Sequence, residues 1–178
     1  MNYCAIKYPD IANGRGIRVS LFVAGCNHRC PGCFNSEAWS FDAGEPFDER
    51  VIDDIMDKLA PSYVEGLSLL GGEPFEPVNQ RGLLPLVRKF RERYPEKDIW
   101  AYTGYVYERD LLPGGRAYCE ATDELLDAVH ILVDGPFVES LKDPSLAFRG
   151  SSNQRLLDLK KLRAGGRPFA VAVEGAVV

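Results

Sequence analysis

The sequence predicts an α/β fold in which parallel strands form a partial (β/α) barrel, with helices on the outside and one lateral side open. Two observations carry this prediction. Short apolar runs alternate along the chain with segments whose apolar residues recur at helical spacing, and this alternation is typical of parallel strands joined by right-handed crossovers. The chain has 178 residues, whereas a complete eight-fold barrel takes about 250, so only part of a barrel is expected.

Four apolar runs of strand length supply the predicted strands. They lie at 17–24, 67–70, 98–103 and 130–133, and a further strand is predicted at 169–173. Because the carboxyl ends of parallel strands meet at one edge of a sheet, the residues that follow these runs are the first candidates for a ligand site.

Three segments with helical periodicity separate the strands. Asp48 is the expected cap of the first helix, which ends before Pro61. The second helix is predicted at 83–94 and the third at 122–129, each with its apolar residues on one face.

The length of the chain, together with the absence of an internal repeat or low-complexity linker, indicates a single domain, 1–178, and residues 156–178 are left as a tail without an assigned role. No apolar run reaches the length of a bilayer span and no secretion signal is visible, so we expect a cytoplasmic protein without membrane contact. Five cysteines, three of them clustered, do not make a disulfide framework. The net charge of −5 gives no support for nucleic-acid binding.

Three cysteines, Cys26, Cys30 and Cys33, form a C-x3-C-x2-C run directly after the first strand. Thiolates are soft ligands that favour iron–sulfur clusters, zinc or copper(I). A cubic [4Fe–4S] cluster held by three thiolates has one iron without a protein ligand, and that iron is free to bind a substrate. A closed zinc site would need His28 as its fourth ligand, although a residue inside so short a loop more often faces solvent.

A glycine motif, Gly71-Gly72-Glu73-Pro74, follows the second strand. Glycines without side chains let a backbone come close to a bound ligand. The cysteine run, with Phe34 directly after its third cysteine, and this glycine motif together resemble the signature of the radical S-adenosylmethionine (SAM) enzymes. The order and separation of the two motifs favour this interpretation over a metal knuckle and an unrelated turn.

Further segments narrow the resemblance within that superfamily. They lie at 1–3, 13–16, 100–105, 132–137 and 142–154. Together they resemble the pattern of anaerobic ribonucleoside-triphosphate reductase-activating proteins over nearly all of the chain up to Arg155. The segment 149–154, Arg-Gly-Ser-Ser-Asn-Gln, discriminates best because the cluster and glycine motifs do not require it.

This resemblance implies a partial barrel of the radical SAM type and a glycyl-radical chemistry. The amine and carboxylate of SAM would chelate the open iron, and an electron from the cluster would cleave SAM to methionine and a 5′-deoxyadenosyl radical. That radical would take a hydrogen atom from a glycine α-carbon of the partner reductase. Glycine suits this chemistry because the absence of Cβ lets its backbone enter a narrow pocket.

The resemblance also implies which residues form the site. Cys26, Cys30 and Cys33 would ligate the cluster. The SAM site would be lined by Gly32, Cys33, Phe34, Gly71, Gly72, Glu73, Thr103 and Asp134. Glu73 either accepts a hydrogen bond from the ammonium of SAM or shapes its turn. Thr103 and Asp134, at strand ends, either contact SAM or are ordinary turn formers.

The implied partners are the anaerobic reductase and a flavodoxin- or ferredoxin-like electron donor. Basic residues of the second predicted helix are either a docking patch for the donor or a solvated helix face; they are Arg88, Lys89, Arg91 and Arg93. The open lateral side would receive a glycine-bearing segment of the reductase, with 13–16 and 149–154 lining the opening. Two alternatives stay open: an activating enzyme for a partner of the pyruvate formate-lyase type, and a non-catalytic zinc or iron–sulfur module.

Overall fold

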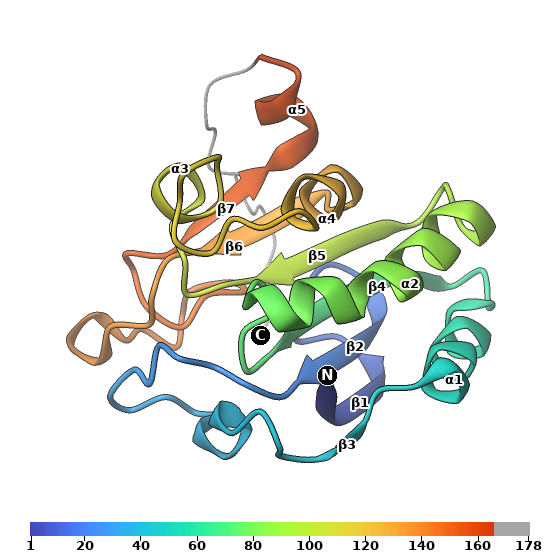
Figure 1. Ribbon diagram of the computed structural model, residues 1–178, viewed down its shortest axis with the longest axis horizontal. Helices are drawn as coiled ribbons and strands as arrows, with labels where there is room; N and C mark the ends of the chain where they lie inside the picture. The colour runs from blue at the N-terminus through green and yellow to red at the C-terminus, as the bar shows by residue number, and fades with distance from the viewer. Residues whose placement is uncertain (166–178) are drawn as a thin grey trace.

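The structure is a computed structural model that describes residues 1–165. Its centre is a seven-stranded sheet with the order β3-β1-β2-β4-β5-β6-β7 (Figure 1). The strands are β1 (Asn2–Asp10), β2 (Ile17–Val23), β3 (Glu45–Pro46), β4 (Val64–Gly71), β5 (Asp98–Tyr102), β6 (Ile131–Asp134) and β7 (Arg155–Asp158). The four predicted strands within this range are present as β2, β4, β5 and β6, and they pair in parallel as expected. The fold is therefore a mixed α/β fold with a parallel centre.

Both edges of the sheet are antiparallel, which the strand–helix alternation does not predict. β1 consists mainly of half-buried residues and so gives no continuous apolar run. β7 has only four residues, at the start of the predicted tail, yet Leu156 and Leu157 are buried where it pairs with β6. Residues 155–163 therefore form the last strand of the sheet and a short helix, so the tail expected at 156–178 begins within regular structure. The strand predicted at 169–173 lies outside the described residues.

Within residues 1–165, five helices and two 3₁₀ turns accompany the strands. They are α1 (Glu49–Leu59), α2 (Pro77–Arg93), α3 (Tyr107–Asp110), α4 (Thr122–Ala128), α5 (Leu159–Arg163), η1 (Ser36–Trp39) and η2 (Glu139–Leu141). Asp48 caps α1 as predicted, because its side chain accepts from the backbone N–H groups of Arg50 and Val51. α2 begins at Pro77 rather than Leu83, since proline is well tolerated in the first turn of a helix.

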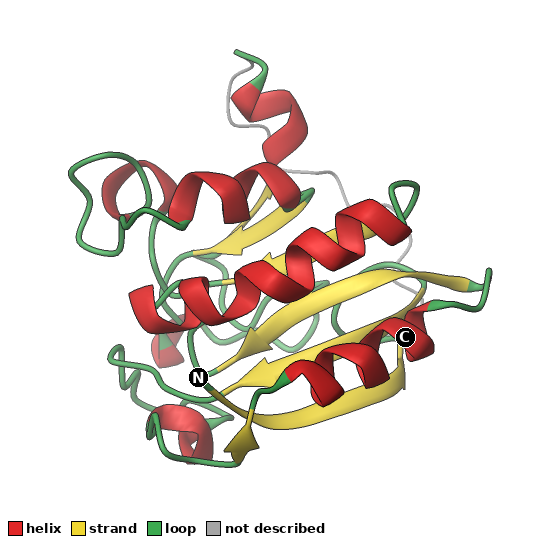
Figure 2. Ribbon diagram, turned by 45° about the vertical axis from the view of Figure 1, so that its right-hand side comes forward, coloured by secondary structure: helices red, strands yellow, loops and turns green. Residues whose placement is uncertain are grey.

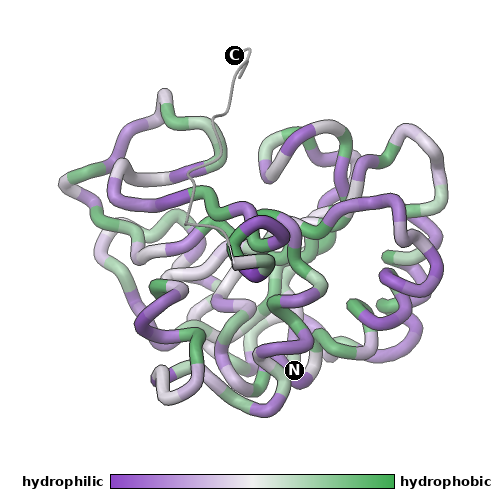
Figure 3. Tube along the Cα trace, turned by 90° about the horizontal axis from the view of Figure 1, so that it is seen from above, coloured by the Kyte–Doolittle hydropathy of each residue, from purple (hydrophilic) through white to green (hydrophobic). Residues whose placement is uncertain are grey.

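The main core lies between one face of the sheet and α1, α2 and α4, which Figures 1 and 2 show lying across that face. Figure 3 shows hydrophobic and hydrophilic residues interspersed along the chain, as expected of elements with one buried face. Successive strand residues point to opposite faces. The other face of the sheet carries a small apolar cluster of Trp100, Val133 and Leu156 beside a buried polar layer. In that layer the Nε atom of Arg18 donates to Ser68 Oγ at 2.7 Å, and its guanidinium pairs with Asp98 at 2.6 Å.

All four parallel strands end at the same edge, so the loops that follow them lie together. These loops contain the cysteine run after β2 and the glycine motif after β4. Within residues 1–165, no helix combines the length and the apolarity that crossing a bilayer requires.

Candidate functional site

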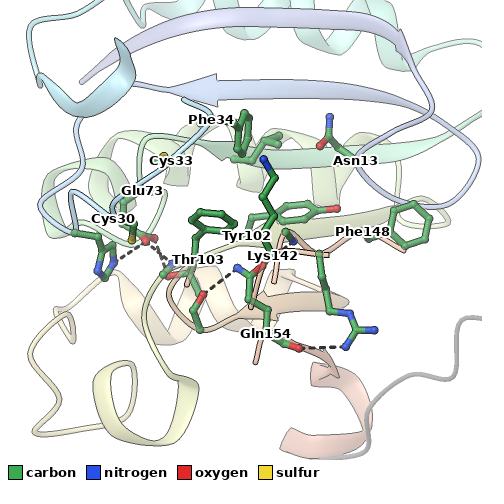
Figure 4. A pocket seen from close by; sticks show the side chains of 18 of the residues that line it. Asn13, Cys30, Cys33, Phe34, Glu73, Tyr102, Thr103, Lys142, Phe148 and Gln154 are labelled. Atoms are coloured by element: carbon green, nitrogen blue, oxygen red, sulfur yellow. Dashed lines mark hydrogen bonds and ion pairs between the residues drawn. The ribbon is translucent and has the colours of Figure 1, made fainter. Parts of the chain in front are cut away.

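A pocket of about 430 Å³ opens where the parallel strands end. Its walls come from the loops after β2, β4, β5 and β6 and from parts of 142–154, so segments far apart in sequence meet there (Figure 4). The predicted site residues that line it are Cys26, Cys30, Gly32, Cys33, Phe34, Gly71, Gly72, Glu73 and Thr103. Asp134 is the predicted site residue that does not line it.

The three cysteines of the run differ in exposure. Cys26 is buried, whereas Cys30 and Cys33 are half-buried, and all three are free thiols. Burial raises the pKa of the Cys26 thiol to about 11, and the carboxylates of Glu73 and Glu76 add to this increase. Burial also raises the pKa of Cys30. Metal-free, these two side chains are therefore thiols at neutral pH, and binding a metal would release their protons.

The donor set suits a soft metal group with space beside it. Three thiols face one pocket, which leaves room next to them for a further ligand. Among the described residues, no group of three or more His, Cys, Asp or Glu side chains is arranged to hold a metal ion. His28, the fourth ligand of the zinc alternative, places its Nε2 atom 3.0 Å from Glu73 Oε2 instead. A multi-iron cluster takes each thiolate on a different iron, so it does not need sulfur atoms that converge on one point.

The glycine motif brings the end of β4 into close backbone contact with the end of β2 and with the cluster loop, residues 25–35. Gly72 N donates to Val23 O at 2.7 Å, and Glu73 N donates to Gly25 O at 2.9 Å. Gly71 has a φ of +111°, and a Cβ atom there would lie 2.5 Å from Val23 N. A Cβ atom on Gly72 would lie 2.6 Å from Gly25 O. Both glycines are therefore needed for this close approach, in addition to lining the pocket.

Glu73 links the three loops around the pocket. Its Oε1 atom accepts from Phe75 N at 2.9 Å and from Thr103 Oγ1 at 2.7 Å. Its Oε2 atom accepts from Gly104 N at 2.7 Å and lies 3.0 Å from His28 Nε2. A carboxylate has about four lone-pair positions, so these protein donors fill its acceptor capacity. This geometry supports the turn-shaping role for Glu73 over acceptance from the ammonium of SAM.

His28 was expected to face solvent, but the structure places it inside the site. Its side chain is only 11% exposed, and its ring packs edge-on against Tyr105 with the ring centroids 4.4 Å apart. The bond to Glu73 holds it there, joining the cluster loop to the turn after β4. No local signal predicts this contact, because its partner is 45 residues away.

A second glutamate of the same turn holds the start of the cluster loop. Glu76 is 4% exposed, and its Oε1 atom accepts from Asn27 N at 3.0 Å. The turn 71–76 thus supplies two buried carboxylates that contact consecutive residues of the loop, Asn27 and His28.

Phe34 and Thr103 line the pocket from different loops. Phe34 is 86% exposed, so its ring is available to a ligand from one side, as Figure 4 shows. Thr103 is buried, donates to Glu73 and accepts from Tyr105 N at 3.0 Å. Gly32 has a φ of +69°, which favours glycine at this turn of the cluster loop.

Asp134 is committed to a different contact. Its Oδ1 atom accepts from Arg155 Nε at 2.8 Å, and its Oδ2 atom accepts from Tyr107 N at 2.9 Å. The side chain is fully buried, and it does not reach the pocket. The structure therefore assigns Asp134 to the junction of β6, α3 and β7.

The segments predicted to line the opening do reach the pocket in part. Asn13, Arg149, Gly150 and Gln154 line it. The Nε2 atom of Gln154 donates to Gly135 O at 3.0 Å, which ties the segment to the end of β6. Tyr102 and Lys142 also line the pocket (Figure 4), and the sequence did not single them out.

Two of the four basic residues proposed as a docking patch on α2 are paired with acidic neighbours, whereas Arg91 contacts His130 and Arg93 stacks on Tyr94. Arg88 bonds Glu124 at 2.6 Å, and Lys89 pairs with Glu49 at 2.9 Å and with Asp53. For Arg88 and Lys89 this pairing supports a solvated helix face over a docking patch for an electron donor.

Comparison with known proteins identifies close relatives. A family model described as a 4Fe-4S single cluster domain matches residues 12–157. A protein of Escherichia coli strain K12 is 43% identical over 156 residues, covering 86% of this chain and 96% of that protein. A Haemophilus influenzae protein is 41% identical over 156 residues, covering 86% and 96%. An Enterobacteria phage T4 protein is 39% identical over 158 residues, covering 88% and 93%. Each relative is named anaerobic ribonucleoside-triphosphate reductase-activating protein.

Proposed function

Because this chain belongs to the family of anaerobic ribonucleoside-triphosphate reductase-activating proteins, we propose that it is a radical SAM enzyme that generates a glycyl radical on an anaerobic ribonucleoside-triphosphate reductase. The observation that carries the proposal is the pocket itself. Three thiols and a glycine-lined strand edge, from the loops after two adjacent parallel strands, face one cavity of about 430 Å³.

Cys26, Cys30 and Cys33 would hold a [4Fe–4S] cluster through three of its irons. When bound, the cluster would supply the electron that cleaves SAM to methionine and a 5′-deoxyadenosyl radical, which abstracts a glycine α-hydrogen of the reductase. The protein residues would bind and orient SAM. Gly32, Cys33 and Phe34 would line it on one side, with the exposed ring of Phe34 against the adenine.

The glycine edge would contact the methionine end of SAM. Gly71 and Gly72 line the pocket without side chains, so their backbone groups are accessible to a ligand there. Thr103 lines the same wall. Glu73 acts as a positioning residue in this proposal, because four protein donors already occupy its oxygens.

The four parallel strands would be the part of a radical SAM barrel that this chain contains, with its open side facing the reductase. A flexible glycine-bearing segment would enter the pocket past Asn13 and the segment 149–154, both of which contribute to its lining. A flavodoxin- or ferredoxin-like protein would supply the electron. Five free thiols suit the reducing environment of the cytoplasm.

Anaerobic reconstitution with iron and sulfide tests this proposal. The reduced protein should give an electron paramagnetic resonance (EPR) spectrum that changes on addition of SAM, and a glycyl radical should form when the reductase is added. Zinc as the metal of anaerobically purified protein, or an unchanged spectrum at saturating SAM, would refute the radical SAM assignment.

Single substitutions provide the matched controls. Replacing Cys26, Cys30 or Cys33 by Ala should abolish SAM cleavage, because each removes one iron ligand. Cys119→Ala should leave cleavage unchanged, since Cys119 does not line the pocket.

A further inference from the structure

Glu76 is a buried carboxylate that the helix it begins does not use. It is the N-cap residue of α2, but its side chain makes no capping hydrogen bond. The side chain instead turns toward the cluster loop, where Oε1 accepts from Asn27 N at 3.0 Å. A capping bond typically stabilises a helix by about 1 kcal/mol. Glu76 does not make this bond, and its side chain instead binds the backbone of Asn27, the residue after Cys26.

The carboxylate of Glu76 has no cationic partner among the described residues. Within residues 1–165, no Lys, Arg or His lies within ion-pair distance of Glu76. Glu73, by contrast, is surrounded by four donors, one of them His28. The Arg116 guanidinium stacks on Tyr105 nearby but is paired with Asp110 at 3.0 Å. The donors of Glu76 are the Asn27 backbone and the neutral hydroxyl of Tyr105, fewer than the four around Glu73, so the Glu76 charge is the less compensated of the two.

The charge acts on the cysteine site without entering the pocket. Asn27, which Glu76 contacts, directly follows Cys26, whereas Glu76 itself does not line the pocket. Glu76 is thus not a ligand contact. Because it is buried, solvent screens its charge much less than that of a surface carboxylate.

We propose that the buried charge of Glu76 lowers the reduction potential of the cluster held by Cys26, Cys30 and Cys33. This inference rests on the function proposed above. Three thiolates already make the bound cluster negative, so a neighbouring anion disfavours the arrival of another electron. The cluster that results is a stronger reductant, which favours electron transfer to SAM. Glu76 acts here as a positioning and electrostatic residue, and it does not touch substrate.

An EPR-monitored redox titration of the reconstituted protein, without SAM or reductase, tests the proposal. Glu76→Gln removes the charge and keeps an oxygen that accepts from Asn27 N. Its midpoint potential should move to a more positive value. Glu76→Asp keeps the charge and shortens the side chain, so its potential should stay nearer that of the wild type. Should Glu76→Gln not fold, Glu76→Met removes the same charge in a similar volume.

An exposed carboxylate beside the cluster loop is the matched control. A Cβ atom on Gly32 would lie 2.6 Å from Glu139 Oε1, and Glu139 is exposed. Glu139→Gln should therefore shift the potential less than Glu76→Gln. An unchanged potential in Glu76→Gln, equal shifts for Gln and Asp at position 76, or an equal shift for Glu139→Gln would each overturn the proposal. Failure of the wild-type protein to hold a cluster would overturn the proposed function as well, which separates the two results.

Discussion

Glu73 lies where the three loops of the site meet. Replacing it by glutamine removes one negative charge and turns one hydrogen-bond acceptor into a donor. The glutamine carbonyl keeps the two bonds made by Oε1, from Phe75 N and Thr103 Oγ1. The amide nitrogen would take the place of Oε2 and face Gly104 N, another donor, at 2.7 Å. His28 can adopt the tautomer that accepts from this nitrogen.

The expected cost follows from those contacts. An unpaired buried N–H group costs about 1–3 kcal/mol, and each bond that loses its charged acceptor weakens by roughly 1 kcal/mol. Since these terms share one side chain and do not simply add, we expect Glu73→Gln to lower the free energy of unfolding by about 3 kcal/mol. The loss arises before any cofactor binds.

Urea unfolding of the metal-free protein under reducing conditions, followed by far-ultraviolet circular dichroism, measures this loss. The control is Glu124→Gln, which makes the same substitution in an exposed ion pair with Arg88 and should be far less destabilising, because solvent screens that pair. If Glu73→Gln is no more destabilising than this control, the carboxylate does not hold the loops together.

Three further predictions concern stability. Burial and neighbouring cations lower the pKa of His130 from 6.5 to about 4, so protonation favours the unfolded chain. The free energy of unfolding should therefore fall by roughly 1–2 kcal/mol as the pH drops from 6.5 toward 4. His130→Asn should flatten this pH dependence in unfolding titrations. Gly72→Ala forces a Cβ atom against the backbone of the cluster loop and should cost about 1–3 kcal/mol, with a lower iron content after reconstitution; full iron loading would contradict it. Arg155→Met leaves the buried Asp134 with one backbone donor and should cost about 3 kcal/mol, against a near-neutral Arg88→Met in thermal unfolding.

The parallel centre of the fold is predictable because β2, β4, β5 and β6 are buried on both faces and read as apolar runs. The antiparallel edges are not. β1 is half-buried and β7 is short, so neither gives a run that exceeds the background of the sequence. Pairing with a neighbouring strand, rather than local composition, places them in the sheet.

The site is predictable where its chemistry is local. The cysteine run and the glycine motif each follow a strand, and parallel pairing of β2 with β4 brings them together. The contacts of His28 with Glu73 and of Asn27 with Glu76 span 45 and 49 residues, and no pattern within either segment marks them. Asp134 is an opposite case. Its position at a strand end suggested a ligand contact, but its carboxylate accepts from Arg155, which lies on a strand that the sequence did not predict.

The double attachment of the cluster loop to the turn 71–76 limits how the site can be moved between proteins. A designer who grafts only the cysteine run onto another α/β sheet would transfer a loop whose first residues have lost both carboxylate partners. The glycines of the turn also fix how closely the two strands approach, since a larger residue at Gly71 meets the backbone of β2 and one at Gly72 meets the backbone of the loop. The loop and the turn would therefore have to be transferred together. An insertion inside the turn should be tolerated far less than one at Gly114, where a side chain would meet nothing within 4 Å.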